Sequence, residues 1–345
     1  MADTLLLRAL KAKPKSLNLC NKSLEKVPKI IGKIDSVLHL QLRNNKLTDL
    51  PNELGHLYQL QHLNVGNNSL TTLPEVLAEL PLLQILHAFN NAISSIAPSV
   101  ISELNHLTVL NLNGNKLKTL PPEICRLVNL QNLSLDNNVL AELPVELCAL
   151  TKLEEFHAAS NQLTMLPLEF GFLVNLEKLH LQKNKIRELP ESLSKCFKLR
   201  VLDIAANELR IFPTELSALP LKELYFEENP LLEHIPVHSV QEEEILALKE
   251  LAARFVMREL KDRWSYLRKM IKHYPQIREM LGQASKCAVC GESFLNTWLE
   301  CVRFIDSKEE LKVKNLNGLI PIRALLCSYK CFNAPGHKYY GVAFP

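Results

Sequence analysis

Glycine is scarce in this chain of 345 residues, which holds only 10 Gly and no G-x-G-x-x-G pattern. The one Gly pair at P-loop spacing, Gly336 and Gly341, is followed by Val342 and Ala343, where a phosphate-binding loop needs Lys and then Ser or Thr. We therefore expect no glycine-rich loop of the kind that cradles phosphates.

Long apolar runs are missing as well. No stretch reaches the roughly 18 residues that a helix needs to cross a bilayer, so we expect no association with a membrane. The first residues, MADTLLLRALKAKPK, hold an apolar stretch that is too short, and too acidic at its start, for a secretory signal. These absences predict a cytoplasmic protein and leave the nucleus open.

Neither sign of charge dominates the chain, in which 40 Lys and Arg face 37 Asp and Glu. Residues 1–240 carry 23 basic and 25 acidic side chains, for a net charge of −2. Residues 241–345 carry 17 basic and 12 acidic side chains, for a net charge of +5. Because these basic residues are interleaved with acids, they are typical of a solvated surface and predict no nucleic-acid partner.

The chain does have an internal repeat, in which Asn recurs every 22 to 24 residues. The nine positions are Asn45, Asn68, Asn91, Asn115, Asn138, Asn161, Asn184, Asn207 and Asn229. Apolar residues lie five and three positions before each Asn and two positions after it, and a Pro follows six positions after most of them. An earlier turn with Lys22 in place of Asn brings the count to ten turns.

Each part of the repeat has a structural interpretation. The L-x-L segment alternates like a strand, with its Leu side chains pointing inward. The Asn amide, at the bend after the strand, can donate to and accept from the backbone of neighbouring turns. The Leu-Pro pair begins the segment that leads back to the next strand, called the return arm below, and this segment should carry a short helix or 3₁₀ turn. Stacking the turns would bury one continuous core.

The repeated pattern L-x-x-L-x-L-x-x-N-x-L-x-x-L-P resembles the leucine-rich repeat family, in its intracellular form with 23-residue turns. The resemblance implies an α/β solenoid with a parallel, concave sheet that serves as a binding surface. We predict an N-terminal cap over residues 1–13, ten repeats over 14–237, a helical segment over 238–284, and a small α+β module resembling a zinc ribbon over 285–345.

Residues between the inward Leu positions should face the concave side, where they form two unusual patches. The first is apolar and the second is acidic. Their members are Ile85, His87, Phe89 and Val109 in the first, and Asp203, Glu223 and Glu227 in the second. Exposed apolar residues on a rigid sheet suit a protein-binding hot spot. The alternative is that both patches are ordinary variable positions.

The C-terminal part contains two cysteine pairs at zinc-ligand spacing. Cys287 and Cys290 form a C-x-x-C-G knuckle, and Cys327 and Cys331 form a C-x-x-x-C pair, with 36 residues between the two pairs. Two predicted strands between the pairs would return the chain, and four thiolates fit a structural Zn²⁺. The nine cysteines, odd in number and without an export signal, argue against disulfides. A redox pair or free thiols are the alternatives, and Cys301 is expected in the core.

Helices are predicted over residues 239–260, 262–272 and 275–283. The segment ALKELAARFVMREL is similar to the Elongin-binding helix of SOCS boxes, with Leu248, Ala252 and Val256 at the matching positions on one face. The resemblance implies recruitment to a cullin-RING ubiquitin ligase. The alternative is that these helices cap the solenoid, and that Leu248, Leu251 and Phe255 form the covered face.

Together these features predict a non-enzymatic adaptor that binds a protein ligand on the concave face. The first alternative is a substrate receptor of a cullin-RING ubiquitin ligase that engages Elongin and cullin components. The lesser alternative is an enzyme, which lacks support because the sequence shows no nucleophile–base signature, no phosphate loop and no metal site with an open position.

Overall fold

The computed structural model of the chain describes residues 2–232, 247–295, 299–313 and 318–341. Its contacts divide the chain into two compact units. The first comprises residues 1–209, 217–230 and 311–316, and the second comprises residues 210–216, 231–310 and 317–345. Each unit is described by itself below.

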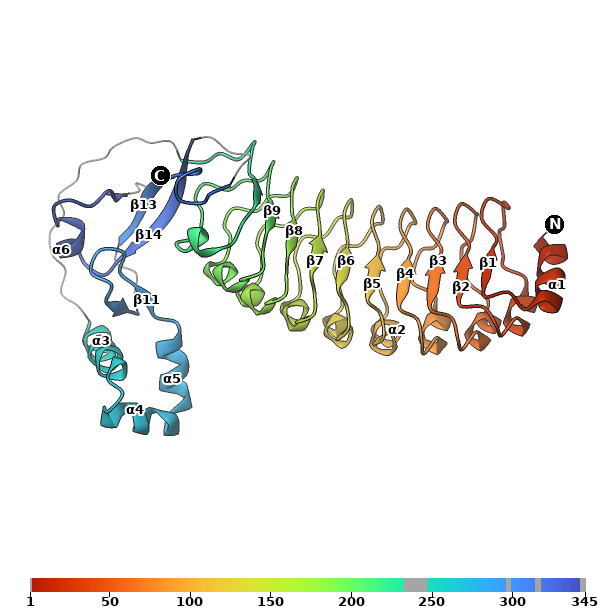
Figure 1. Ribbon diagram of the computed structural model, residues 1–345, viewed down its shortest axis with the longest axis horizontal. Coiled ribbons are helices and arrows are strands. Elements are labelled where there is room, and N and C mark those ends of the chain that lie inside the picture. The colour runs from red at the N-terminus through yellow and green to blue at the C-terminus, as the bar shows by residue number, and fades with distance from the viewer. Residues whose placement is uncertain (1, 233–246, 296–298, 314–317, 342–345) are drawn as a thin grey trace. The chain divides into compact units, whose positions relative to one another are not determined.

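The first unit is a leucine-rich repeat solenoid, as predicted (Figure 1). Its ten short strands pair in sequence order, and every pair is parallel. They are β1 (Ser16–Asn18), β2 (His39–Gln41), β3 (His62–Asn64), β4 (Ile85–His87), β5 (Val109–Asn111), β6 (Asn132–Ser134), β7 (Glu155–His157), β8 (Lys178–His180), β9 (Val201–Asp203) and β10 (Glu223–Tyr225). The predicted ten turns and their strand positions are confirmed.

The core of the solenoid is a column of side chains from the middle of each strand. Successive members pair across the sheet, as Leu40 pairs with Leu63 and Leu133 with Phe156. None of the ten is more than 7% exposed. The flanking strand residues are half-buried or exposed, so the alternation places one face in the core and the other on the concave surface.

The return arms carry short helices. Eight are 3₁₀ turns of five residues or fewer that follow a Pro or lie close to one, and α2 is an α-helix in the turn where Ala97 replaces that Pro. They are η1 (Lys29–Lys33), η2 (Asn52–His56), η3 (Glu75–Glu79), α2 (Pro98–Glu103), η4 (Pro122–Arg126), η5 (Val145–Ala149), η6 (Leu168–Phe172), η7 (Glu191–Lys195) and η8 (Leu216–Ala218). The extended backbone of each Pro, such as Pro51 with φ −71°, sets the direction in which the arm begins.

The repeated Asn residues form a ladder of hydrogen bonds along the solenoid. Asn138 donates to the carbonyls of Leu112 and Leu135, and its Oδ1 accepts from the backbone N–H of Leu117, all at 2.9–3.0 Å. All nine Asn residues make this set of bonds to their own and neighbouring turns. Asn138 is only 6% exposed, so the ladder satisfies buried backbone groups where the chain bends.

Helix α1 (Ala2–Ala12) precedes the first strand and buries Leu6 and Ala9. The helix lies within residues 1–13, for which the sequence analysis predicts an N-terminal cap, and the boundaries of that cap stay a prediction.

The second unit combines short helices with small antiparallel sheets (Figure 1). Its helices are α3 (Leu248–Lys261), α4 (Tyr266–Met270), η9 (Ile271–His273), α5 (Pro275–Gly282) and α6 (Tyr329–Phe332). Its strands are β11 (Ser285–Lys286), β12 (Ser293–Phe294), β13 (Leu299–Asp306), β14 (Leu319–Leu326) and β15 (Tyr340–Gly341). Residues 233–246 lie outside the described residues, so the start of the helix predicted over 239–260 and the predicted boundary at 237 stay predictions.

The packing of α3 differs from the prediction. Leu248 and Phe255, predicted to be covered together with Leu251, are 83% and 61% exposed. The buried face of α3 instead holds Glu250, Ala253 and Met257. The prediction from periodicity was wrong because it counts a glutamate as a surface residue. Glu250 is instead fully buried and accepts hydrogen bonds from Arg254 and Leu295.

A piece of the ninth return arm belongs to the second unit. Phe212 donates from its N–H to the carbonyl of Pro321 at 3.0 Å and accepts from the N–H of Arg323 at 2.8 Å. These bonds attach residues 210–216 to β14, which pairs with β13 along its other edge. The edge of β14 is thereby partly covered, as unpaired sheet edges in soluble proteins commonly are.

Candidate metal centre and binding surfaces

The first cysteine pair lies in the turn between β11 and β12. These strands pair antiparallel, and Cys287 exchanges backbone bonds with the turn, accepting from Gly291 and donating to Glu292 at 2.9 Å. Gly291 has φ +72°, a conformation that side-chain-bearing residues rarely adopt. The Gly of the C-x-x-C-G pattern is therefore required by the turn that presents Cys287 and Cys290.

The second pair follows β14 directly. Cys327 comes after the last residue of the strand, and Cys331 lies in α6, which Ser328 caps. Strands β13 and β14 pair over eight residues each and return the chain to the knuckle, as the sequence predicted. A backbone bond of 2.9 Å from Ala288 to Leu325 fastens the knuckle to the end of β14.

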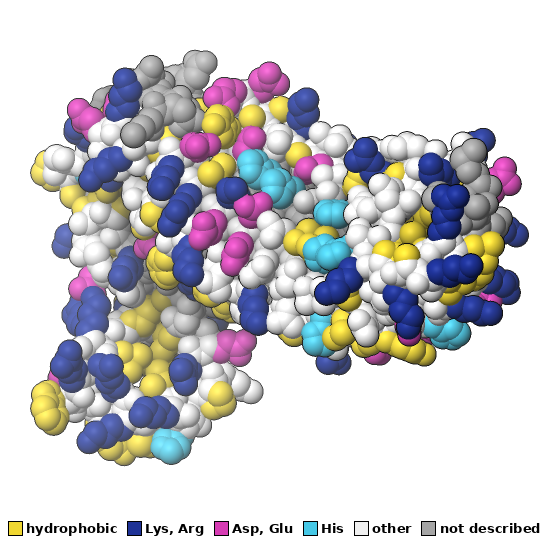
Figure 2. Space-filling model, turned by 45° about the vertical axis from the view of Figure 1, so that its right-hand side comes forward, with side chains coloured by type: hydrophobic (Ala, Val, Ile, Leu, Met, Phe, Trp, Pro, Cys, Tyr) yellow, Lys and Arg dark blue, Asp and Glu magenta, His cyan; other side chains and the backbone are white. Residues whose placement is uncertain are grey.

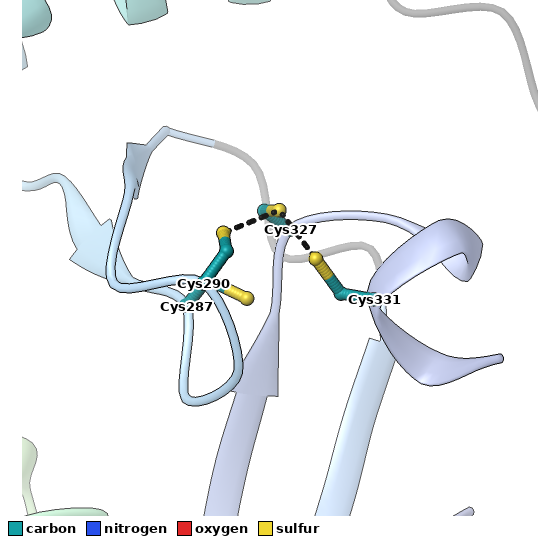
Figure 3. A group of neighbouring side chains, drawn as sticks. All are labelled: Cys287, Cys290, Cys327 and Cys331. Atoms are coloured by element: carbon teal, nitrogen blue, oxygen red, sulfur yellow. Dashed lines mark hydrogen bonds between the residues drawn. The ribbon is translucent and has the colours of Figure 1, made fainter. Parts of the chain in front are cut away.

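The four sulfur atoms converge in one cluster (Figure 3). All lie within 4.8 Å of one another, with Cys327 Sγ 3.6 Å from that of Cys290 and 3.5 Å from that of Cys331. Around a tetrahedral Zn²⁺ with bonds of about 2.3 Å, sulfurs would lie about 3.8 Å apart. A disulfide needs about 2.0 Å. The spacing thus fits four ligands of one ion.

The thiols of the cluster differ in how readily they ionise. Burial raises the pKa of Cys287, but hydrogen bonds from the backbone around Cys290, Cys327 and Val289 outweigh it and bring the pKa down from 9.0 to about 7. Burial raises the pKa values of Cys327 and Cys331. The lowered pKa favours the thiolate of Cys287, which is the form that binds metal ions.

Cys301 lies next to this cluster without joining it. It is fully buried on β13 among Phe294, Ala324 and Leu326. Burial raises the pKa of Cys301 to about 12, so it stays a neutral thiol. Its position is that of a core residue, as the sequence analysis expected.

Helix α3 is connected to the cysteine cluster by a buried ion pair that the sequence analysis missed. Arg254 donates to the carboxylate of Glu250 at 2.7 Å and to the carbonyl of Cys327 at 2.7 Å. Glu250, fully buried, also accepts from the N–H of Leu295 at 3.1 Å. The i, i+4 spacing of Glu250 and Arg254 is common on solvated helices, so no local signal marks this pair as buried.

The structure brings the predicted apolar patch together on β4 and β5. Ile85 pairs with Val109, and the His87 ring lies edge-on to Phe89 at 6.4 Å between centroids. The Phe89 ring covers Gly66, where a Cβ atom would come within 2.6 Å of it. All four patch residues are half-buried.

The patch is also uncharged. Burial lowers the pKa of His87, so its imidazole is neutral near pH 7. Its Nδ1 atom is buried and has no hydrogen-bond partner among the described residues. The surface of the patch is therefore apolar and uncharged overall.

The predicted acidic patch is less uniform. Glu223 and Glu227 are exposed, and Tyr225 donates its hydroxyl to Glu223 at 3.1 Å. Asp203 is half-buried and lies 3.9 Å from His180, whose ring stacks on His157 at 4.5 Å. Asp203 and Glu223 thus each interact with a side chain of the sheet, and the two glutamates are more exposed than Asp203.

Comparisons with known proteins agree with this fold. The leucine-rich repeat region family model matches residues 91–211, and the leucine rich repeat model matches residues 35–93. Among solved structures, YopM from Yersinia pestis is 29% identical with a TM-score of 0.54, covering 68% of this chain and 60% of its own. The plant peptide hormone receptor RGFR1, solved in complex with RGF2, is 28% identical with a TM-score of 0.55, covering 65% of this chain and 42% of its own.

Relatives by sequence extend the match to the C-terminal unit. Leucine-rich repeat-containing protein 69 of Xenopus laevis is 63% identical over 343 residues, which is 99% of each chain. The Homo sapiens protein of that name is 42% identical over 123 residues, covering 36% of this chain and 35% of its own. The first match includes both cysteine pairs within its span. The chain therefore belongs to the leucine-rich repeat family, in the group of leucine-rich repeat-containing protein 69.

Proposed function

We propose that this protein is a non-enzymatic cytoplasmic adaptor that binds a protein ligand on the concave face of its solenoid, at the patch of Ile85, His87, Phe89 and Val109. The leucine-rich repeat fold is typical of protein-interaction domains. The bound RGF2 in the RGFR1 structure is an instance in a solenoid of similar fold. Ten hydrogen-bonded strands give the patch a rigid base, which limits the conformational entropy lost on binding.

The observation that carries this proposal is the position of Phe89. Its ring lies over Gly66 rather than inside the core, and Ala88 beside it is the buried residue. An aromatic ring supported from beneath and half-open to solvent is a favourable anchor for an apolar partner side chain. The neutral His87 adds no charge that an apolar ligand would have to desolvate.

The test is proximity labelling in cells with the full chain, comparing wild type with Phe89→Asp. The matched control is Phe172→Asp, which introduces the same charge at an exposed Phe on the return arm η6. We expect Phe89→Asp to lose a set of labelled proteins that the control keeps, with an unchanged melting temperature. Identical protein sets for the two variants would reject the concave site, and a sharp fall in melting would place Phe89 in the core.

We also propose that Cys287, Cys290, Cys327 and Cys331 hold one structural Zn²⁺. The supporting observation is the convergence of four sulfurs within 4.8 Å in a unit with a small core. Four thiolates complete a tetrahedral coordination sphere and leave no open position for a reacting water. Elemental analysis of purified protein should give one zinc per chain. Less than about half an equivalent would reject the site.

The second candidate function is a substrate receptor of a cullin-RING ubiquitin ligase. It is supported by the face of α3 that carries Leu248, Ala252 and Val256, of which the first two are exposed and the third is half-buried. Purified Elongin should then bind the full wild-type chain, and the change Leu248→Asp should abolish that binding. Ile277→Asp, on the exposed surface of α5, is the control. No binding by the wild type would reject this candidate.

A further inference from the structure

Three helical elements of the second unit line a groove with a volume of about 570 Å³. Leu260 comes from α3, and the other walls come from α4 with η9 and from α5. The remaining lining residues are Arg268, Ile271, Lys272, Arg278, Leu281 and Gly282. Ligand sites in proteins commonly enclose about 300–1,000 Å³, so the groove has room for several side chains of a bound peptide.

The floor of the groove is apolar. Leu260, Ile271 and Leu281 are half-buried, and each comes from a different element. Gly282 ends α5 beside them, and a Cβ atom built there would meet nothing within 4 Å. The groove is therefore open on that side, and its three aliphatic side chains are exposed to whatever enters.

The rim of the groove is positively charged. Arg268, Lys272 and Arg278 are all exposed. In the described part of the chain, no carboxylate lies within ion-pair distance of any of the three, whereas Lys261 pairs with Glu292 at 3.3 Å. Residues 258–286 hold eight Lys and Arg against three Asp and Glu. Figure 2 shows basic side chains gathered over the lobe at the lower left, with apolar side chains between them.

We propose that this groove docks an acidic peptide segment of a partner protein. An aliphatic or aromatic side chain of the segment packs against Leu260, Ile271 and Leu281, and flanking carboxylates pair with the basic rim. The observation that selects this partner is charge complementarity around an apolar floor. A nucleic acid would leave that floor unused, and a flat membrane surface would not enter a groove.

This second site does not depend on the concave one. It shares no residue with the patch around Phe89, nor with Leu248, Ala252 and Val256 on α3. An adaptor with both sites would hold two proteins at once. Loss of ligands in Phe89→Asp and loss of acidic peptides in a groove variant are separate results, so either proposal can fail while the other stands.

The test begins with selection from a random peptide library displayed on phage, with the full chain as target. We expect the enriched peptides to carry Asp or Glu on both sides of a Leu, Ile or Phe. A fluorescein-labelled copy of the most enriched peptide is then titrated with wild type and with the variant Arg268→Glu/Lys272→Glu/Arg278→Glu. Affinity should fall at least about ten-fold in the variant and should weaken with added salt.

Two controls keep the result decisive. The variant Lys116→Glu/Lys118→Glu/Lys183→Glu reverses the same charge on exposed solenoid residues and should bind the peptide like wild type. If the groove variant does not fold, the single change Arg278→Gln replaces it, with a smaller loss expected. Enrichment of neutral or basic peptides, no enrichment, or equal binding by the variant would overturn the proposal. So would phosphatidylserine vesicles that bind wild type and not the variant while no acidic peptide is enriched.

Discussion

In the solenoid the main contacts repeat from turn to turn, whereas in the C-terminal unit each contact occurs once. Asn138 bonds to three backbone groups of its own and adjacent turns, and Leu133 packs between its counterparts in the strands on either side. Among the residues that the structure describes, the core around the cysteines contains six buried residues, two of which are candidate metal ligands. In a repeat array the stabilising contacts between neighbouring turns add up along the chain. The stability of a small unit without repeats depends more on a few cross-links, such as a bound metal ion.

The largest difference between the two regions should follow removal of the metal ligands. In the variant Cys287→Ser/Cys331→Ser we expect complete loss of zinc and loosening of residues 285–341, because metal binding to such a site contributes directly to folding. The solenoid should keep its melting transition. Circular dichroism and elemental analysis measure both effects.

Cys301→Ser is the matched control for that variant, since Cys301 is a buried thiol beside the cluster and outside it. It should keep a full equivalent of zinc. Loss of zinc in Cys301→Ser, or unchanged zinc in the double variant, would mean that the four ligands are wrongly chosen.

The next largest effect concerns the Asn ladder. Asn138→Ala should lower the free energy of unfolding by about 1–3 kcal/mol, because it leaves buried backbone groups without partners. Asn132→Ala, on the concave side of β6, should change it by no more than about 0.5 kcal/mol. Urea denaturation followed by circular dichroism measures both. Equal losses at the two positions would contradict the ladder.

A smaller effect, on zinc affinity, should follow replacement of Arg254. Replacing it with Met removes the hydrogen bond to the Cys327 carbonyl and leaves buried Glu250 without its charge partner. We expect zinc affinity to fall about 10–100-fold, the usual cost of losing a residue that orients a metal ligand. Competition with a chromophoric chelator measures it. Arg258→Met, an exposed change on the same helix, should leave the affinity unaltered.

The smallest effect should come from pH acting on the histidines of the solenoid. Burial lowers the pKa values of His62, His87 and His157 below their usual 6.5. Below about pH 6.5 the unfolded chain binds more protons than the folded one, so stability should fall as the pH drops toward the folded pKa values. The melting temperature of His87→Asn should therefore depend less steeply on pH between 7 and 5 than that of wild type. A steeper dependence would contradict the sign.

Much of the solenoid follows from the sequence, because its contacts repeat at fixed spacing. The strand positions, the inward Leu column and the role of Asn138 all follow from a single period. The sequence analysis did not predict a second ladder of hydrogen bonds. In it, each Asn side chain bonds to the one in the preceding turn, along Asn21, Asn44, Asn67 and Asn90. These four Asn residues recur every 23 residues, but the next turn holds Gly114 at this position and the series of side-chain bonds ends there. The position holds Asn again at Asn137 and other residue types in the later turns.

The C-terminal unit was predictable only where spacing is local. The two cysteine pairs and the returning strands could be read from short motifs. The buried Glu250 could not, because its environment is completed by Leu295, 45 residues away, and by Arg254, which reaches Cys327, 73 residues away. Contacts between distant segments that occur once leave no periodic signal, and the inward face of α3 was therefore misassigned.

The proposed contrast between a solenoid that is stable without metal and a C-terminal unit that depends on zinc is tested most directly by hydrogen–deuterium exchange of the full chain, with and without a zinc chelator. Chelation should abolish protection in β13 and β14 while strands β1 to β9 keep theirs unchanged. Unchanged protection throughout, or equal loss of protection in both regions, would contradict the difference in stabilisation proposed between them.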